Sequence, residues 1–128
     1  MAIAKMGVVV LDCPDPKSLA EFYAAVLGWK VEESEDEQDW VEVLSPDSGR
    51  QLAFQESPGY IPPQWPSLEH GQQFHLDFDV PKAGIEEAER EVLALGARLV
   101  QGDGDGARGF RVYLDPVGHP FCLCMTDR

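Results

Sequence analysis

The protein has 128 residues, of which 44% are hydrophobic, and a formal net charge of −13. This length and apolar content suit one compact domain with its own core, whereas the negative charge argues against nucleic acid or an anionic membrane as a partner, because both need a basic surface. No stretch of the sequence is apolar for long enough to span a membrane, and the N-terminus is expected to enter a strand rather than form a signal peptide.

A strand followed by a helix is expected at the start of the chain. Alternating residues near 3–12 predict the strand. Asp15 then fits a helix N-cap, Pro16 the first helical position and Gly28 the C-terminal stop. The apolar residues between them have helical spacing, which predicts an amphipathic helix; they are Leu19, Phe22, Tyr23, Val26 and Leu27.

Three more strands are expected near residues 29–34, 39–45 and 50–56. Between the first two lies an acidic run, from Glu32 to Asp39, which lacks the spaced ligands and central glycine of a calcium loop. We interpret this run as a solvated hairpin loop rather than a cation site. A turn containing Pro46 and Gly49 joins the last two strands.

The second half of the chain repeats the first. Leu44 and Pro46 recur as Leu114 and Pro116, and strands are expected near residues 73–80, 97–101, 109–114 and 119–125. A second helix carries Ile85, Ala88, Val92 and Leu95 on its apolar side and Glu86, Glu87, Glu89 and Glu91 on its solvated side. The sequence therefore predicts an α+β fold, in which a strand, a helix and three strands occur twice.

A proline-rich arm, residues 58–71, joins the two repeats, which occupy about residues 1–57 and 72–128 of a single domain. The arm carries two aromatic residues, Tyr60 and Trp65, where a simple linker would more often be small and polar. Their rings could cover the seam between the repeats or close the mouth of a pocket, and the sequence leaves both alternatives open.

The order of these motifs resembles the vicinal oxygen chelate superfamily, which includes glyoxalase I, bleomycin-resistance proteins and extradiol dioxygenases. The resemblance rests on the repeated unit and on three further motifs: Phe22-Tyr23, Leu27-Gly28 and the turn Asp115-Pro116-Val117-Gly118-His119-Pro120. Short glyoxalase-like domain proteins are similar at Phe54-Gln55, Trp65-Pro66 and His75-Leu76-Asp77. The resemblance implies that each repeat curls its strands into a half-open cup with the helix outside, and that two cups enclose a pocket.

The resemblance also implies where a metal would bind. Metal-dependent members hold a divalent ion with His, Gln or Glu from equivalent strand positions of both repeats. Here these positions are Val8, Ala53, His75 and Cys122, of which only His75 is a conventional ligand. A shift of two residues along the last strands would offer Gln55 and Cys124 instead. We therefore expect no classical metal and no other cofactor.

The remaining polar and aromatic residues predict a ligand pocket. His75 could act as a catalytic acid or base, because histidine titrates near neutral pH and Asp77 could orient the ring. It could equally be a hydrogen-bonded histidine in a half-buried strand. The strand register leaves Val41 open as an alternative to Trp40, and Arg111 as an alternative to Tyr113. The predicted binding residues are Trp40, Phe54, Gln55, Tyr60, Trp65, His75, Asp77, Tyr113 and Cys122.

Three classes of function are compatible with these features. The first is a metal-independent protein that binds or sequesters a small organic molecule, for which the aromatic residues are suited. The second is an enzyme of the superfamily, a lyase, isomerase or dioxygenase, which uses unusual metal ligands or His75 as acid or base. The third is an interaction domain without a ligand.

A homodimer is expected because pairing covers open edge strands. The three cysteines favour reduced thiols and a cytoplasmic location.

Overall fold

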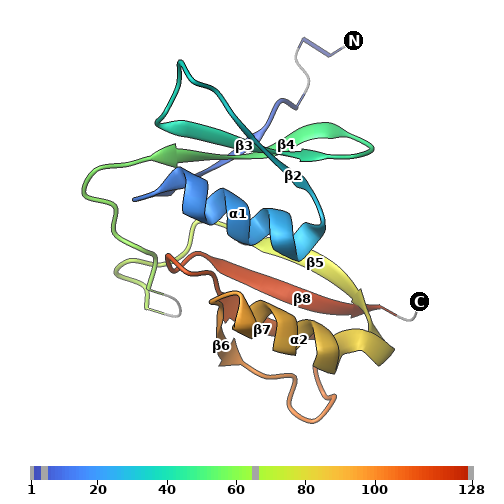
Figure 1. Ribbon diagram of the computed structural model, residues 1–128. Coiled ribbons are helices and arrows are strands. Elements are labelled where there is room, and N and C mark those ends of the chain that lie inside the picture. Colours follow the sequence, from blue (N-terminus) through green and yellow to red (C-terminus); the bar gives the residue numbers. More distant parts are fainter. Residues whose placement is uncertain (1, 4–5, 65–66, 127–128) are drawn as a thin grey trace. The chain divides into compact units, whose positions relative to one another are not determined.

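The computed structural model describes residues 2–3, 6–64 and 67–126 (Figure 1). The chain divides into two compact units, Met1–Tyr60 and Ile61–Arg128. The first contains β1 (Val9–Cys13), α1 (Pro16–Leu27), β2 (Lys30–Glu33), β3 (Trp40–Ser45) and β4 (Gly49–Glu56). The second contains β5 (Leu76–Pro81), a short 3-10 helix η1 (Lys82–Gly84), α2 (Ile85–Ala94), β6 (Arg98–Gln101), β7 (Phe110–Leu114) and β8 (Pro120–Thr126). The predicted order, a strand, a helix and three strands made twice, is confirmed.

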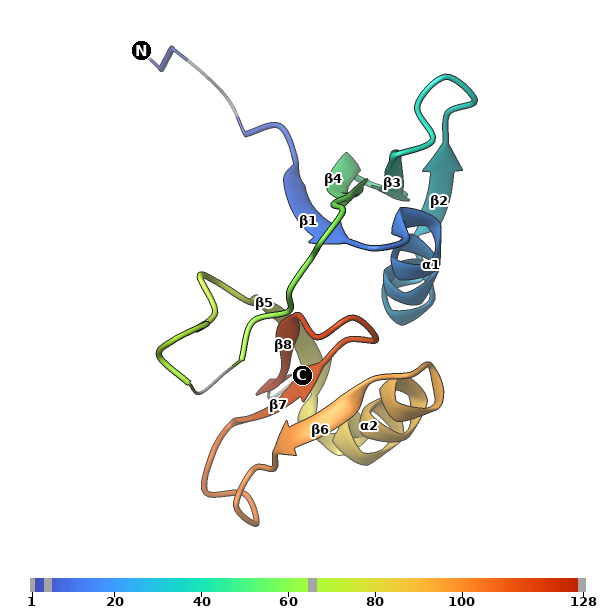
Figure 2. The same cartoon turned by 90° about the vertical axis from the view of Figure 1, so that its left-hand side faces the viewer.

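The first unit is a four-stranded sheet with α1 along one face (Figure 2). The strand order is β1-β4-β3-β2, with β1 parallel to β4 and the other neighbours antiparallel. Asp15 caps α1 as predicted, because its side chain accepts a hydrogen bond from the backbone N–H of Lys17 at 3.2 Å. On the inner side of α1 the Tyr23 ring stacks on Phe54, with ring centroids 5.6 Å apart. This aromatic contact fixes which face of β4 belongs to the core.

The second unit repeats this architecture with the order β5-β8-β7-β6 and with α2 beside the sheet (Figure 2). Here β5 is parallel to β8, and the remaining pairs are antiparallel. The core-facing side carries three aromatic rings, because Phe121 lies 5.7 Å from Phe78 and 5.4 Å from Tyr113 between ring centroids. Both sheets are therefore mixed and open, as the predicted α+β class requires.

The Pro/Gly turn has the same chemistry in both units. In the first, Ser45 Oγ accepts backbone hydrogen bonds from residues 47 and 48, both at 3.3 Å. In the second, Asp115 Oδ1 accepts from the backbone N–H of Val117 at 2.9 Å and of His119 at 3.0 Å. Gly118 has a φ of 98°, a conformation that other residues rarely adopt. A short polar side chain before the proline thus shapes each hairpin.

Four details differ from the sequence prediction. One is that β5 begins at Leu76 rather than near residue 73, so His75 lies just before the strand. The first strand begins only at Val9, and Leu95 lies beyond the last residue of α2 and is exposed. Glu89 was expected on the solvated side of α2, but its side chain is only 21% exposed because it faces Arg111 and Tyr113 of β7. The acidic residues 32–39 are exposed, which agrees with a solvated loop. No helix within the described residues is long and apolar enough to cross a membrane.

Candidate functional site

The open face of the second sheet, the side without α2, brings ligand-type side chains together. Cys122 of β8 pairs with Asp77 of β5 and with Val112 of β7, so these three side chains share one face. The neighbouring positions Leu76 and Phe121 pair with each other on the opposite face. The alternation of the strands therefore separates an apolar helix-facing side from an open side with polar groups.

A cavity of about 220 Å³ lies on this open face. One part of its wall is apolar and comes from the two central strands; the other is polar and comes from β5 and the residues before it. The lining residues are Gln72, His75, Asp77, Phe110, Val112, Pro120 and Cys122. All of these described lining residues belong to the second unit.

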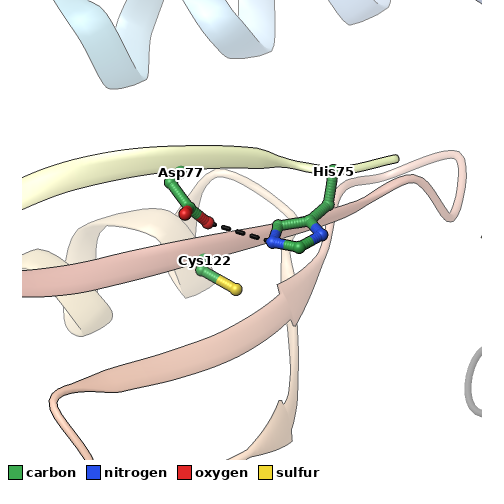
Figure 3. A group of neighbouring side chains, drawn as sticks. All are labelled: His75, Asp77 and Cys122. Carbon is green, nitrogen blue, oxygen red and sulfur yellow. Dashed lines mark ion pairs between the residues drawn. The ribbon is translucent and has the colours of Figure 1, made fainter.

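His75, Asp77 and Cys122 form the polar end of this cavity (Figure 3). Nε2 of His75 lies 3.1 Å from Oδ1 of Asp77, an ion pair when the ring is protonated. The Cys122 side chain is nearly buried on β8 and points to the same side of the sheet as the other two (Figure 3). One donor atom from each residue lies within 4.8 Å of the other two. The suggestion that Asp77 orients His75 agrees with this geometry.

Burial and negative charge keep the two open-face thiols protonated. Burial, followed by the charge of Asp77, raises the pKa of Cys122 to about 12. The pKa of Cys124 is raised by burial and by the charges of Asp77 and Asp79. A thiol with a raised pKa is a poor nucleophile at neutral pH, so Cys122 is unsuited to covalent catalysis on its own.

Gln72, one of the lining residues, carries a buried side-chain atom that has no hydrogen-bond partner among the described residues. Its Oε1 is buried and accepts no hydrogen bond from any residue that the structure describes. A buried acceptor without a donor costs about 1–3 kcal/mol. Sequence reasoning missed this residue because it lies before β5, outside the alternating pattern of the strand.

The structure also places two of the predicted residues of the first unit on an open face. Trp40 of β3 pairs with Gln55 of β4, so both side chains lie on the face away from α1. The indole Nε1 of Trp40 donates a hydrogen bond to Glu42 at 3.0 Å. Trp40 rather than its alternative Val41 therefore has the predicted orientation, since Val41 pairs with Phe54 on the helix side.

Phe54 and Tyr113 were expected in the pocket wall, and neither lines the cavity of the second unit. Both are fully buried on the helix-facing sides of their sheets, where Phe54 stacks on Tyr23 and the Tyr113 hydroxyl donates to Glu89 at 2.7 Å. Tyr60 ends the first unit in a turn after β4 and is half-buried. Trp65 lies outside the described residues.

Arg111, the alternative to Tyr113, also faces the helix. Its guanidinium is only 10% exposed and contacts three carboxylates, those of Glu86 at 2.6 Å, Glu89 at 3.2 Å and Asp103 at 2.9 Å. The hydrogen bond to Glu86 raises the pKa of Arg111 further above its already high ordinary value. The cavity wall therefore comes from the neighbouring positions, Phe110 and Val112.

The residues do not fit the four-ligand divalent centre of metal-dependent superfamily members. Val8 and Ala53, the two equivalent positions in the first unit, have no atom that can donate a lone pair. The second unit retains His75 but has a cysteine at the other position, and its third nearby donor, Asp77, lies on β5, which begins directly after His75. No chemical step through the classical centre follows from these side chains.

Comparison with known proteins gives the class of the protein. The family model described as "Glyoxalase-like domain" matches residues 8–124. The chain therefore belongs to the glyoxalase-like domain family, within the vicinal oxygen chelate superfamily, and the predicted relationship is confirmed. A comparison with curated proteins gives no match.

Solved structures show the same fold at low sequence identity. The fosfomycin resistance protein FosX from Mesorhizobium loti is 16% identical with a TM-score of 0.70, and the match covers 98% of this chain and 94% of FosX. A glyoxalase/bleomycin resistance protein/dioxygenase family enzyme from Burkholderia phytofirmans is 20% identical with a TM-score of 0.67, covering 91% and 94% of the two chains. The oxidase ChaP-H2 is 21% identical with a TM-score of 0.64, covering 98% and 95%.

Proposed function

We propose that this glyoxalase-like protein binds a small organic molecule in the cavity of its second unit, without the classical divalent metal of the superfamily. The observation that carries the proposal is the cavity itself, whose wall includes Gln72, a residue with a buried Oε1 that has no hydrogen-bond partner among the described residues. Native structures rarely leave such an acceptor unsatisfied. A ligand that donates a hydrogen bond to it would remove the cost and so gain affinity.

The wall chemistry defines the kind of molecule. Phe110, Val112 and Pro120 offer apolar contact, while Gln72 and His75 offer the few polar contacts that orient a ligand. The volume of about 220 Å³ is below the roughly 300–1,000 Å³ of pockets for drug-sized molecules. A compact ligand of about one ring with a hydroxyl or amino group fits this combination.

An enzyme of the superfamily, a lyase, isomerase or dioxygenase, is the second candidate, and the His75–Asp77 pair favours it. The carboxylate 3.1 Å from Nε2 holds the ring in one orientation, as an acid–base catalyst requires. Such an enzyme would process the same compact ligand, so binding is the first property to measure.

The experiment uses protein stripped of metal with a chelator. Single-ring compounds with and without a hydroxyl or amino donor are screened by thermal shift, because a ligand of the native state raises the melting temperature. Affinities of the hits are then measured by calorimetry for the wild type, for Gln72→Leu and for His75→Ala. Gln51→Leu, an exposed position on β4, is the matched control.

We expect Gln72→Leu to lose about tenfold in affinity for donor-bearing ligands, equivalent to about 1.4 kcal/mol. Its stability without ligand should be unchanged or higher, because the unsatisfied acceptor is gone. His75→Ala should weaken binding with little loss of stability, since its side chain is 39% exposed. If no compound binds, or if neither substitution changes the affinity, the proposed function is refuted.

The assembly and location remain proposals of the same kind. Exposed Leu99 and Val100 on the edge strand β6 support pairing into a homodimer. A monomer mass by light scattering at micromolar concentration would rule the dimer out.

Cys122 and Cys124 lie on one strand as thiols, which supports a reducing, cytoplasmic environment. That the two repeats act as a single domain stays a prediction, and one cooperative unfolding transition would support it.

A further inference from the structure

The polar end of the cavity combines three side chains with different preferences for metal ions. Cys122 offers a soft sulfur, His75 an imidazole nitrogen and Asp77 a carboxylate oxygen, all within 4.8 Å of one another. We infer that these three residues bind one thiophilic divalent ion of the Zn²⁺ type within the second unit alone. The inference adds a second ligand to the cavity and does not rest on the binding of an organic molecule.

The separation of the nitrogen and oxygen donor atoms is close to that of a zinc site. Ligands at about 2.0–2.1 Å from a tetrahedral zinc ion place a nitrogen and an oxygen about 3.3 Å apart. In the structure His75 Nε2 and Asp77 Oδ1 are 3.1 Å apart. A sulfur at about 2.3 Å from the ion would lie about 3.5 Å from either of them. Rotation of the exposed His75 and Asp77 side chains toward the fixed Cys122 would close the remaining distance.

The ligand set selects a soft ion over a hard one. Mg²⁺, Ca²⁺ and Mn²⁺ prefer oxygen ligands, whereas sulfur with imidazole suits Zn²⁺ and related ions. Asp77 and the Cys122 thiolate together balance the two positive charges of the ion. Binding releases the thiol proton of Cys122 to solvent, as the sulfur–metal bond replaces the S–H bond.

Three protein ligands leave the fourth position of a tetrahedral ion open. This is the arrangement of catalytic rather than structural zinc sites, in which water or a substrate takes the fourth position. The open position would face the cavity, because all three ligands line it. Val8 and Ala53 of the first unit are not needed for such a site.

Cobalt titration of the metal-free full chain tests the inference without any activity assay. A bound Co²⁺ should give a sulfur-to-metal charge-transfer band and the visible bands of tetrahedral cobalt, at one ion per chain. Adding Zn²⁺ should bleach both, whereas Mg²⁺ and Mn²⁺ should not. Cys122→Ser and Asp77→Asn are compared with Cys124→Ser, a matched control two residues along the same strand. Circular dichroism confirms that each variant folds.

We expect Cys122→Ser to lose the charge-transfer band, and Cys124→Ser to keep it. Loss of either ligand, Cys122 or Asp77, should weaken Co²⁺ binding by more than the roughly 10–100-fold typical of losing an outer partner. The inference is overturned if wild-type protein gives no band, if the band is lost in Cys124→Ser instead, or if one ion is shared by two chains. Should Cys122→Ser not fold, Cys122→Ala is measured in the same way, and persistence of tight binding refutes the site.

The two proposals fail separately. Gln72→Leu should retain the cobalt spectrum while weakening the organic ligand, because Gln72 is not one of the three donors. Cys124→Ser changes no residue of the cavity wall and should retain both the cobalt spectrum and the organic ligand. A protein that binds cobalt but no ring compound would refute the proposed function alone, and the converse would refute the metal site alone.

Discussion

Replacing Tyr113 by Phe tests which face of the second sheet carries the binding site. The Tyr113 hydroxyl donates to Glu89 at 2.7 Å on the side of α2, and its ring stacks on Phe121. Phe keeps the ring contact and removes only the hydrogen bond. A hydrogen bond to a charged group contributes about 1.5–3 kcal/mol. Without the hydroxyl, Glu89 still has its ion pair with Arg111 at 3.2 Å, and its side chain is partly exposed. We therefore expect the substitution to lower the free energy of unfolding by only about 1–2 kcal/mol.

Urea unfolding measures this loss as a lower midpoint with an unchanged slope. In a Glu89→Gln background the same substitution should cost less, because the charged partner of the hydroxyl is absent, and the double-mutant cycle isolates that coupling. Affinity for any ring compound found in the screen should be that of the wild type. The reverse pattern, unchanged stability with weakened binding, would show that the hydroxyl of Tyr113 points into the cavity and that the faces are misassigned.

Two further substitutions and one chemical modification test other parts of the structure. Gly118→Ala should cost about 1–3 kcal/mol in urea unfolding, because a Cβ there would lie 2.6 Å from Pro62 at a φ of +98°; no loss would mean that Pro62 does not lie against the turn. Asp15→Ala should cost about 1 kcal/mol through the lost cap. The hydrogen bond from Ser18 lowers the pKa of Asp15 below 3.8, so this difference should be full near neutral pH and shrink as the pH falls below about 4; a constant difference would contradict the cap. Alkylation of Cys122 by iodoacetamide should be slow at pH 7 and accelerate as the pH approaches about 12, whereas fast labelling at pH 7 would show a reactive thiolate.

Local chemistry made the fold predictable from the sequence. The helix limits at Asp15 and Gly28 and the repeated Pro/Gly turn depend on side chains and backbone conformations a few residues apart. Such interactions are already encoded in a short stretch of sequence. The sequence repeat supported the same prediction a second time, because each half predicted the same order of elements.

The pocket wall was harder to predict because it depends on which face of each strand the helix covers. In β4 the apolar run 52–54 gives no alternation, so the core position of Phe54 could not be separated from an open one. In β7 the polar tips of Arg111 and Tyr113 indicated a pocket, yet both tips reach carboxylates of α2. Amphipathic side chains can pack their apolar parts in the core while their polar ends form hydrogen bonds. Residue type alone therefore does not show whether a side chain lies on the helix-facing or the open face of a sheet.

The two open faces explain why the chemistry is concentrated in one unit. Both units need the helix-facing side and the turn in order to fold, and there they share an aromatic stack, Tyr23 on Phe54 in one and Tyr113 on Phe121 in the other. The open face has no helix packed against it, so its side chains are free of that requirement. In the first unit the positions equivalent to His75 and Cys122 are Val8 and Ala53, which can neither bind a metal nor transfer a proton. The three donors of the second unit therefore come from elements of one repeat, and a metal or an organic ligand that uses them depends on that repeat first.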